Sequence, residues 1–292
     1  MRTRREEFAN YSSIFLDGKT LRIPLDKDKP ITELHWPEFY DVGINSVCYA
    51  KCPWCYTSST PKGINFDNII DKIYDFFGKM TLNQRAFQVA IGGSGEATVH
   101  PKFIEVLETF SKLEIVPNYT TNAMHLSDKV IEATKKYCGG VAISLHPHLE
   151  KIWRKGIKTL INNRIKTNIH IIISDKDSID YLERLYNEYN NRIDYFVLLP
   201  YMNFGFGGGV NSKEIDYDYL EKFLDKIAHY GNIAFGSNFY KFLQRIKKYN
   251  VSLYPPEILS KYLIMDDDMK LYNNSFLKRE VKFSHETGVQ FA

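Results

Sequence analysis

The chain has 292 residues, of which 44% are hydrophobic, 14% aromatic and 25% charged. These values are typical of a globular protein with a sizeable core rather than a disordered or disulfide-stabilised chain. The 38 basic and 35 acidic residues leave a net charge of +3, which is too small to indicate nucleic-acid binding. No stretch approaches the roughly 20 apolar residues that span a membrane, and the N-terminus has no apolar signal core. We therefore expect a cytoplasmic protein with no membrane partner.

The first segment with a clear pattern is Phe15–Ile23, where Asp17-Gly18 between apolar runs predicts a hairpin turn. We therefore expect an N-terminal β-hairpin extension over residues 1–36.

Short apolar runs then alternate with helix-like periodicity, which predicts six strand–helix units. The predicted strands are Phe39–Ile44, Phe87–Gly93, Ile115–Thr121, Val141–Leu145, Thr167–Ser174 and Tyr195–Pro200. The predicted helices are Phe66–Met80, Pro101–Leu113, Ser127–Cys138, Leu149–Asn162, Ser178–Asn190 and Glu214–Tyr230. Helices between short apolar strands favour a parallel sheet with right-handed crossovers, either an open sheet or a barrel.

The C-terminal part is predicted to hold a further strand at Asn232–Phe235, a helix at Phe239–Tyr249 and a hairpin that turns at Asp266–Asp268. We therefore expect a main domain over residues 37–235 and a C-terminal extension over residues 236–292 that packs on it.

Three of the four cysteines lie within eight residues, in the run CYAKCPWC. Cys48, Cys52 and Cys55 form a C-x3-C-x2-C pattern directly after a predicted strand, which chance would place in roughly one chain in a thousand. Three thiolates can hold three irons of a cubane cluster and leave the fourth iron open. A structural zinc site would need a fourth ligand, for which His35 and His100 are lone candidates.

The fourth cysteine, Cys138, stands alone at the end of a predicted helix, where a buried structural thiol is expected. Three clustered cysteines and one lone cysteine fit a reducing compartment and a metal site better than a disulfide framework.

With this loop the chain resembles the radical S-adenosylmethionine superfamily, whose hallmark loop carries an aromatic residue before the third cysteine, here Trp54. The resemblance implies a partial (β/α)6 TIM-like barrel with an N-terminal hairpin extension and a C-terminal α+β extension. It implies a 4Fe-4S cluster on Cys48, Cys52 and Cys55, whose open iron binds the methionine moiety of S-adenosyl-L-methionine, with Trp54 near the adenine. Reductive cleavage of that cofactor would give a 5′-deoxyadenosyl radical that abstracts hydrogen from a substrate. A reductase or a flavodoxin- or ferredoxin-type protein would donate the electron.

A second match is the run IGGSGEATVHP at the end of the next strand, which looks like the glycine-glycine-glutamate motif of the family. By this match Gly92, Gly93, Gly95 and Glu96 would contact the methionine end of the cofactor. Ala97 stands where the family usually has proline, a departure that concerns the local turn.

Weaker matches extend this site along the chain. Asn122 lies in a run that resembles the threonine-asparagine turn of the family, and the backbone around Leu199 would lie beside the adenine. Ser144 ends a strand where family members place a polar group near the ribose, and a plain core or turn role is equally open. His146 and His148 follow the same strand and are candidates for acid–base groups that face the substrate.

The segment Leu263–Phe276 looks like a degenerate form of the SPASM or twitch hairpin that opens the auxiliary-cluster extension of peptide-modifying members. It carries Asn273 and Asn274 and no cysteine, so no auxiliary cluster is expected. The glycine-rich run Phe204–Val210 is predicted to be a flexible loop of the active site.

The sequence does not identify the substrate, for which a peptide is one candidate because of the degenerate hairpin. A glycyl-radical activase or a nucleotide- or nucleic-acid-modifying enzyme is an alternative. A non-catalytic iron-sulfur or zinc-binding protein is an alternative of another class. Cleavage of S-adenosylmethionine separates the enzymes from the binding protein.

Overall fold

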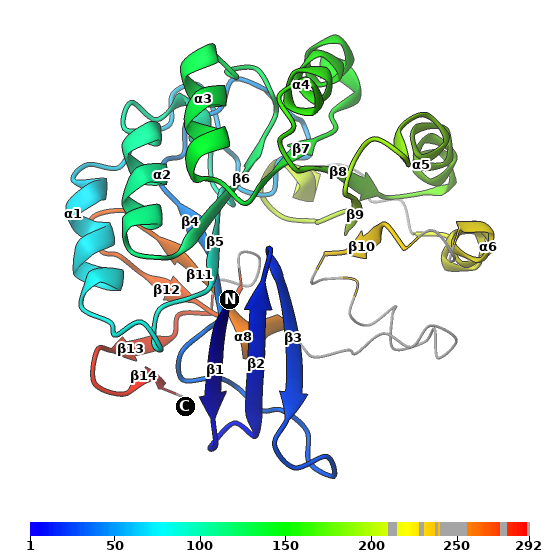
Figure 1. Ribbon diagram of the computed structural model, residues 1–292. Coiled ribbons are helices and arrows are strands. Elements are labelled where there is room, and N and C mark those ends of the chain that lie inside the picture. The colour runs from blue at the N-terminus through cyan, green and yellow to red at the C-terminus, as the bar shows by residue number, and fades with distance from the viewer. Residues whose placement is uncertain (210–214, 228–230, 237–238, 240–255, 275–278, 291–292) are drawn as a thin grey trace.

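The structure, a computed structural model, describes residues 1–209, 215–227, 231–236, 239, 256–274 and 279–290. Within these residues a nine-stranded sheet runs in the order β10-β9-β8-β7-β6-β5-β4-β11-β12 (Figure 1). Its strands are β4 (Phe39–Gly43), β5 (Gln88–Ile91), β6 (Val116–Thr121), β7 (Gly140–Ser144), β8 (Thr167–Ile173), β9 (Tyr195–Pro200), β10 (Ile233–Phe235), β11 (Ser260–Ile264) and β12 (Leu271–Tyr272). Each neighbouring pair from β11 to β10 is parallel, and only β12 runs antiparallel to its neighbour.

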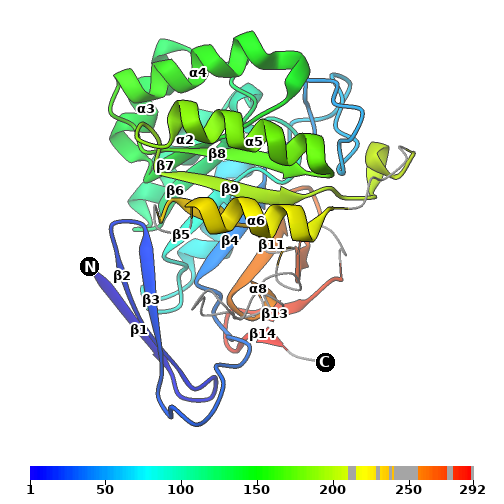
Figure 2. The same ribbon diagram turned by 90° about the vertical axis from the view of Figure 1, so that its right-hand side faces the viewer.

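The helices follow the strands one by one and lie on the outer face of the curved sheet (Figure 1), and Figure 2 shows the same packing from the side. They are α1 (Ile69–Ile73), continued by a π-helical turn (Tyr74–Gly78), α2 (Phe103–Lys112), α3 (Asp128–Tyr137), α4 (Glu150–Asn162), α5 (Lys176–Tyr189) and α6 (Tyr217–Ile227). The predicted six strand–helix units and the α/β fold class are thereby confirmed, since β4 to β9 alternate with α1 to α6.

Alternate residues of the barrel strands point to opposite faces of the sheet. On β4 the outward Tyr40 and Val42 are fully buried under the helices, whereas Phe39 and Asp41 are only half-buried. The same alternation runs through β6 and β8, where half-buried polar residues such as His170 separate buried apolar ones. The outward face therefore forms the core, and the inward face lines an interior that is open in part.

The N-terminal extension is a three-stranded antiparallel sheet of β1 (Arg2–Glu6), β2 (Tyr11–Leu16) and β3 (Lys19–Pro24). The predicted hairpin turn lies between β2 and β3, and β1 adds a strand that the sequence pattern did not reveal. The turn reaches the start of the barrel strands, where Lys166 donates a hydrogen bond to the Asp17 carbonyl at 3.3 Å. Phe15 stacks on Phe87 with ring centres 5.1 Å apart. This sheet thus covers the N-terminal end of the barrel.

The C-terminal segment returns to the main sheet through a short helix, α8 (Pro256–Leu259), and the strands β11 and β12. The predicted hairpin is confirmed by the antiparallel pairs of β11 with β12, with the three aspartates in the turn. A last hairpin is formed by β13 (Lys282–Ser284) and β14 (Gly288–Gln290). The predicted helix Phe239–Tyr249 falls outside the described residues except for Phe239. The domain boundaries stay a prediction, although β11 shows that the C-terminal segment completes the sheet beside β4.

Within the described ranges, no helix has both the length and the apolar character needed to cross a membrane.

Candidate active site

The cysteine loop joins β4 to α1 at the C-terminal edge of the sheet, where parallel barrels carry their active sites. Backbone hydrogen bonds fix its two ends together, from Ser46 to the Ile64 carbonyl at 2.8 Å and from Cys48 to the Thr60 carbonyl at 3.0 Å. A Cβ on Gly63 would lie 2.2 Å from the Ser46 carbonyl oxygen, so only glycine allows this close approach. The loop is therefore folded back on itself as a compact unit.

Each of the three cysteine sulfurs faces a polar side chain. Asn122 Nδ2 donates to Cys48 Sγ at 3.7 Å, and His148 Nε2 lies 4.0 Å from Cys52 Sγ. The third sulfur, Cys55 Sγ, lies 3.3 Å from the hydroxyl of the neighbouring threonine. These three groups come from two other strand ends and from the loop itself. The Asn122 amide and the threonine hydroxyl would serve as hydrogen-bond donors to thiolates, whereas His148 Nε2 donates to the Ala50 carbonyl at 2.7 Å and lies beside Cys52 as a polar neighbour.

Burial disfavours the ionised form of two of the three thiols. Burial raises the pKa of Cys48, with further contributions from Glu96 and Cys55. Burial also raises the pKa of Cys52 to about 12, and the neighbouring Cys48 and Cys55 add to the rise. Three thiolates in this place need a cationic partner, which an iron-sulfur cluster supplies. Among the residues described, no group of three or more His, Cys, Asp or Glu side chains is arranged to hold a metal ion. The assignment of a cluster to Cys48, Cys52 and Cys55 thus stays a prediction from their spacing.

The glycine-rich turn after β5 lies against the cysteine loop. Gly95 donates its N–H to Ser59 Oγ at 3.0 Å, and Tyr56 donates to the Gly93 carbonyl at 3.3 Å. Gly93 and Gly95 have φ values of 78° and 60°, which favour glycine. A Cβ on Gly95 would lie 2.2 Å from Asn45 Oδ1. Glycine at these two positions therefore allows the turn to lie in close contact with the cysteine loop.

Glu96 is buried, and its carboxylate joins the turn to the end of β6. Its Oε1 accepts hydrogen bonds from the Thr121 hydroxyl at 2.7 Å and from the hydroxyl of Thr98 at 2.6 Å. Its Oε2 accepts from the Asn122 N–H at 2.8 Å. All of these are contacts within the protein, and they hold Asn122 where its amide faces Cys48. A contact of Glu96 with a cofactor stays a prediction, and the structure shows a positioning role.

Beside this turn, the barrel encloses a cavity of about 490 Å³. Of the residues predicted to bind cofactor, Trp54, Gly93, Ser144 and Leu199 line it. Gly92, Gly95, Glu96 and Asn122 are not among its lining residues. Trp54 belongs to the cysteine loop, so one wall of the cavity is formed by this loop.

The two candidate acid–base histidines do not line this cavity. Their rings pack on Trp54, with centres 6.2 Å away for His146 and 5.6 Å away for His148. His148 Nε2 lies 2.7 Å from the Ala50 carbonyl, which ties β7 to the cysteine loop. Burial, and then the charge of His148, lowers the pKa of His146 to about 4. Both histidines are placed to support the loop.

The glycine-rich segment after β9 also packs on the cysteine loop. Phe206 donates its N–H to the Cys55 carbonyl at 2.9 Å. Gly205 has φ +56°, and a Cβ there would lie 2.6 Å from the same carbonyl oxygen. Its glycines therefore permit backbone contact, a role that the sequence analysis did not assign. Val210, the last residue of the predicted run, lies outside the described residues.

Sequence reasoning missed several residues that line the cavity. The polar ones are Asp41, Tyr56, Thr120, His170, Tyr201, Ser260, Lys261, Asn273 and Asn274. The signal was present in the alternation of polar and apolar residues within β4 and β8. The last two asparagines lie at the end of the predicted hairpin, so this hairpin closes the cavity rather than opening a second site.

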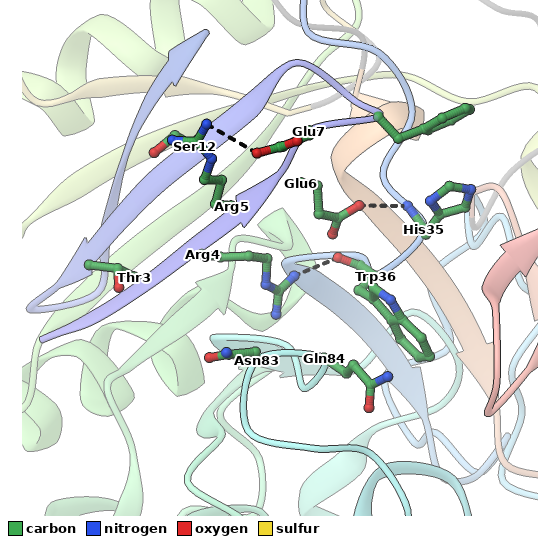
Figure 3. Close-up of a pocket in the computed structure, with 11 residues that line it drawn as sticks. Thr3, Arg4, Arg5, Glu6, Glu7, Ser12, His35, Trp36, Asn83 and Gln84 are labelled. Carbon is green, nitrogen blue, oxygen red and sulfur yellow. Dashed lines mark hydrogen bonds and ion pairs between the residues drawn. The ribbon is translucent and has the colours of Figure 1, made fainter. Parts of the chain in front are cut away.

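A separate cavity of about 610 Å³ lies beside β1 at the N-terminal sheet (Figure 3). Its charged groups each have at least one partner within the protein, although Arg4 Nε and Glu6 Oε1 are buried without one among the described residues. Arg4 donates to the Trp36 carbonyl, Glu6 accepts from the His35 N–H at 3.0 Å, and Arg5 pairs with a neighbouring glutamate. None of the residues predicted to bind the cluster or S-adenosylmethionine lines this cavity, although His35, a candidate ligand of the alternative zinc site, does.

The fold of this chain is similar to that of several solved structures. No protein-family model and no curated protein sequence matches the chain. Among solved structures, SuiB of Streptococcus suis bound to the precursor peptide SuiA aligns with a TM-score of 0.66 and 18% identity, over 85% of this chain and 62% of SuiB. The chain anSMEcpe with bound AdoMet aligns with a TM-score of 0.59 and 15% identity, over 82% of this chain and 75% of that one.

The chain has the fold of the radical S-adenosylmethionine enzymes. SuiB bound to S-adenosylmethionine aligns with a TM-score of 0.63 and 17% identity, over 83% of this chain and 61% of SuiB. The chain therefore spans about three fifths of the length of SuiB. The radical S-adenosylmethionine fold confirms the expected partial barrel.

Proposed function

We propose that this protein is a radical S-adenosylmethionine enzyme. The observation that carries the proposal is the compact loop of Cys48, Cys52 and Cys55, which lies at the C-terminal edge of β4 between a glycine-rich turn and the barrel cavity. The shared fold with enzymes that bind S-adenosylmethionine supports it.

In this proposal Cys48, Cys52 and Cys55 hold a 4Fe-4S cluster with one open iron. Reductive cleavage of S-adenosylmethionine at such a cluster yields methionine and a 5′-deoxyadenosyl radical. An external reductase, flavodoxin or ferredoxin would deliver the electron.

The protein's own residues bind and orient the cofactor. The backbone of Gly92 and Gly93 would hold the methionine end, where a side chain on Gly93 would approach Tyr262 to 2.8 Å. Trp54 keeps a buried Nε1 that has no partner among the described residues, so this N–H is available to a bound molecule. Ser144 and Leu199 line the same cavity and would lie along the adenosine.

We further propose that the substrate is a peptide. SuiB was solved with a precursor peptide, and anSMEcpe was solved with AdoMet and the Cp18Cys peptide, at a TM-score of 0.56 and 14% identity. The cavity has walls from the cysteine loop and from the segment after β12, so a peptide side chain within it would lie beside the cofactor.

Anaerobic reconstitution with iron and sulfide tests the reaction. The loaded protein, reduced with dithionite in the presence of S-adenosylmethionine, should release 5′-deoxyadenosine, measured by mass spectrometry. Cys52→Ala should lose both iron and product. Cys138→Ala should retain both, because this half-buried thiol lies outside the loop. A cluster of full iron content and correct spectrum that gives no product would refute the enzyme.

A further inference from the structure

Asp41 and His170 are two titratable side chains within the barrel that the proposed reaction leaves without a role. In the described part of the chain, neither side chain makes a hydrogen bond or an ion pair with another residue, and the shift in the pKa of each comes from burial. Both side chains are half-buried and line the same cavity, so a carboxyl and an imidazole without a protein partner face whatever occupies it.

The two fully buried acids among the described residues, Glu38 and Glu96, have partners within the protein. Glu38 accepts a hydrogen bond from Arg22 Nε at 2.8 Å. Glu96 accepts from the Asn122 N–H and from two threonine hydroxyls. Asp41 differs from them because its carboxylate faces open space. An acid that is left open inside a cavity is typical of a group that meets a ligand.

Asp41 lies in the middle of the barrel, between two cavities. It lines the 490 Å³ cavity on the cysteine side and also a 380 Å³ cavity toward the N-terminal sheet. His170 and Thr120 line both cavities as well. A molecule that enters beside the cysteine loop and extends into the barrel therefore reaches Asp41.

The charges of the cavity leave Asp41 uncompensated. Lys261 also lines the cavity, but its ammonium is fully buried in an ion pair with Glu33 at 2.9 Å. Burial lowers the pKa of His170 to about 4, so the imidazole is neutral at pH 7. Burial raises the pKa of Asp41 to about 7, because no cation or hydrogen-bond donor stabilises its ionised form. Tyr262, its neighbour in register on β11, carries no charge at this pH.

We propose that Asp41 binds a basic group of the substrate, a primary amine or a guanidine, inside the barrel. The ligand supplies the cation that the protein does not, and the resulting ion pair fixes how deep the substrate lies. His170 and Thr120 complete the polar surface around that group. This inference rests on the proposed function, since it places the substrate beside the radical cofactor.

Three probes of one chain length test the assignment: pentylamine, 1-pentanol and pentanoate. Their binding to the reconstituted protein with S-adenosylmethionine, unreduced at pH 8, can be measured by ligand-observed NMR. Pentylamine should bind at least about tenfold more tightly than either other probe, a difference of about 1.4 kcal/mol. Asp41→Asn should remove this preference. Asp41→Ser is a second uncharged variant, which should also remove the preference and which tests whether the asparagine amide itself perturbs the cavity. Asp267→Asn, which changes an exposed carboxylate of the β11–β12 turn, should leave the preference intact.

Equal binding of the three probes, or a preference for pentanoate, would overturn the inference. Loss of S-adenosylmethionine affinity in Asp41→Asn would also overturn it, because Asp41 would then serve the cofactor. Formation of 5′-deoxyadenosine without substrate is measured separately. If the loaded wild type forms this product but shows no preference for the amine, only the inference fails. If the amine preference holds but no product forms, the proposed function fails.

Discussion

Replacing Asp41 with asparagine should stabilise the free protein, and the gain should increase with pH. The folded state raises the pKa of this carboxyl to about 7 from an ordinary value of 3.8 through burial. For an acid whose pKa is raised, the protonated form is favoured by folding, so stability is lost as pH rises from the unfolded pKa through the folded one. At 1.36 kcal/mol for each pH unit, the cost approaches roughly 4 kcal/mol at pH 8 and roughly 2 kcal/mol at pH 5. Asparagine has the same shape and no charge, so it avoids this cost.

The assay is urea unfolding of wild-type and Asp41→Asn protein without cluster, under anaerobic reducing conditions at pH 5 and pH 8. The difference between the two proteins isolates Asp41, because every other titrating group is common to both. Because the pKa of His170 is lowered, this residue reduces the stability of the protein in the opposite direction, as pH falls below about 6.5. This contribution is the same in both proteins and cancels in the difference. A variant that is less stable than wild type at pH 8, or a gain that is the same at both pH values, would show that the carboxylate has a partner in the folded protein.

Two further substitutions probe the cysteine loop. Asn122→Ala should make the midpoint potential of the reconstituted cluster more negative, lowering the reduced-to-oxidised ratio by up to about tenfold, or about 59 mV, because it removes the amide that donates to Cys48 Sγ at 3.7 Å. Spectroelectrochemistry measures this, with the exposed His125→Ala as control, and an unchanged potential would contradict it. Gly205→Ala should reduce iron loading, because its Cβ would lie 2.6 Å from the Cys55 carbonyl oxygen. Gly18→Ala, at φ +78° with no heavy atom within 4 Å of its Cβ, should retain full iron content, and equal loading of both variants would contradict the reasoning.

Much of the fold was accessible from the sequence because parallel strands and helices differ in period. The apolar run Thr167–Ser174 and the helical pattern after it give β8 and α5 almost at their predicted ends. The boundary of α5 moved to Lys176 because Asp175 and Ser178 form a capping box. By contrast, β1 was missed, since the charged run Arg2–Glu6 has no apolar period and pairs only through its backbone with β2.

The interior of the barrel was harder to predict. Asp41 lies between Tyr40 and Val42, and a polar residue in a short apolar run indicates the inward face of the strand but not what fills the space there. That depends on the closure of the sheet by β11, whose register beside β4 is set by residues more than two hundred positions away. A single sequence carries no signal for this pairing. The cavity, and with it Asp41 and His170, therefore became visible only in three dimensions.

In the cysteine loop, too, the sequence predicts the ligands but not the residues that surround them. The spacing of Cys48, Cys52 and Cys55 predicts the ligands of the proposed cluster, since each is a residue type that binds iron. The groups around them come from separate strand ends: Asn122 after β6, His148 after β7 and the glycine-rich turn after β9. These contacts join the loop to strand ends that lie far from it in the sequence, so the spacing of the cysteines could not predict them. The ligand pattern is local, whereas the contacts that support it depend on the fold of the whole barrel.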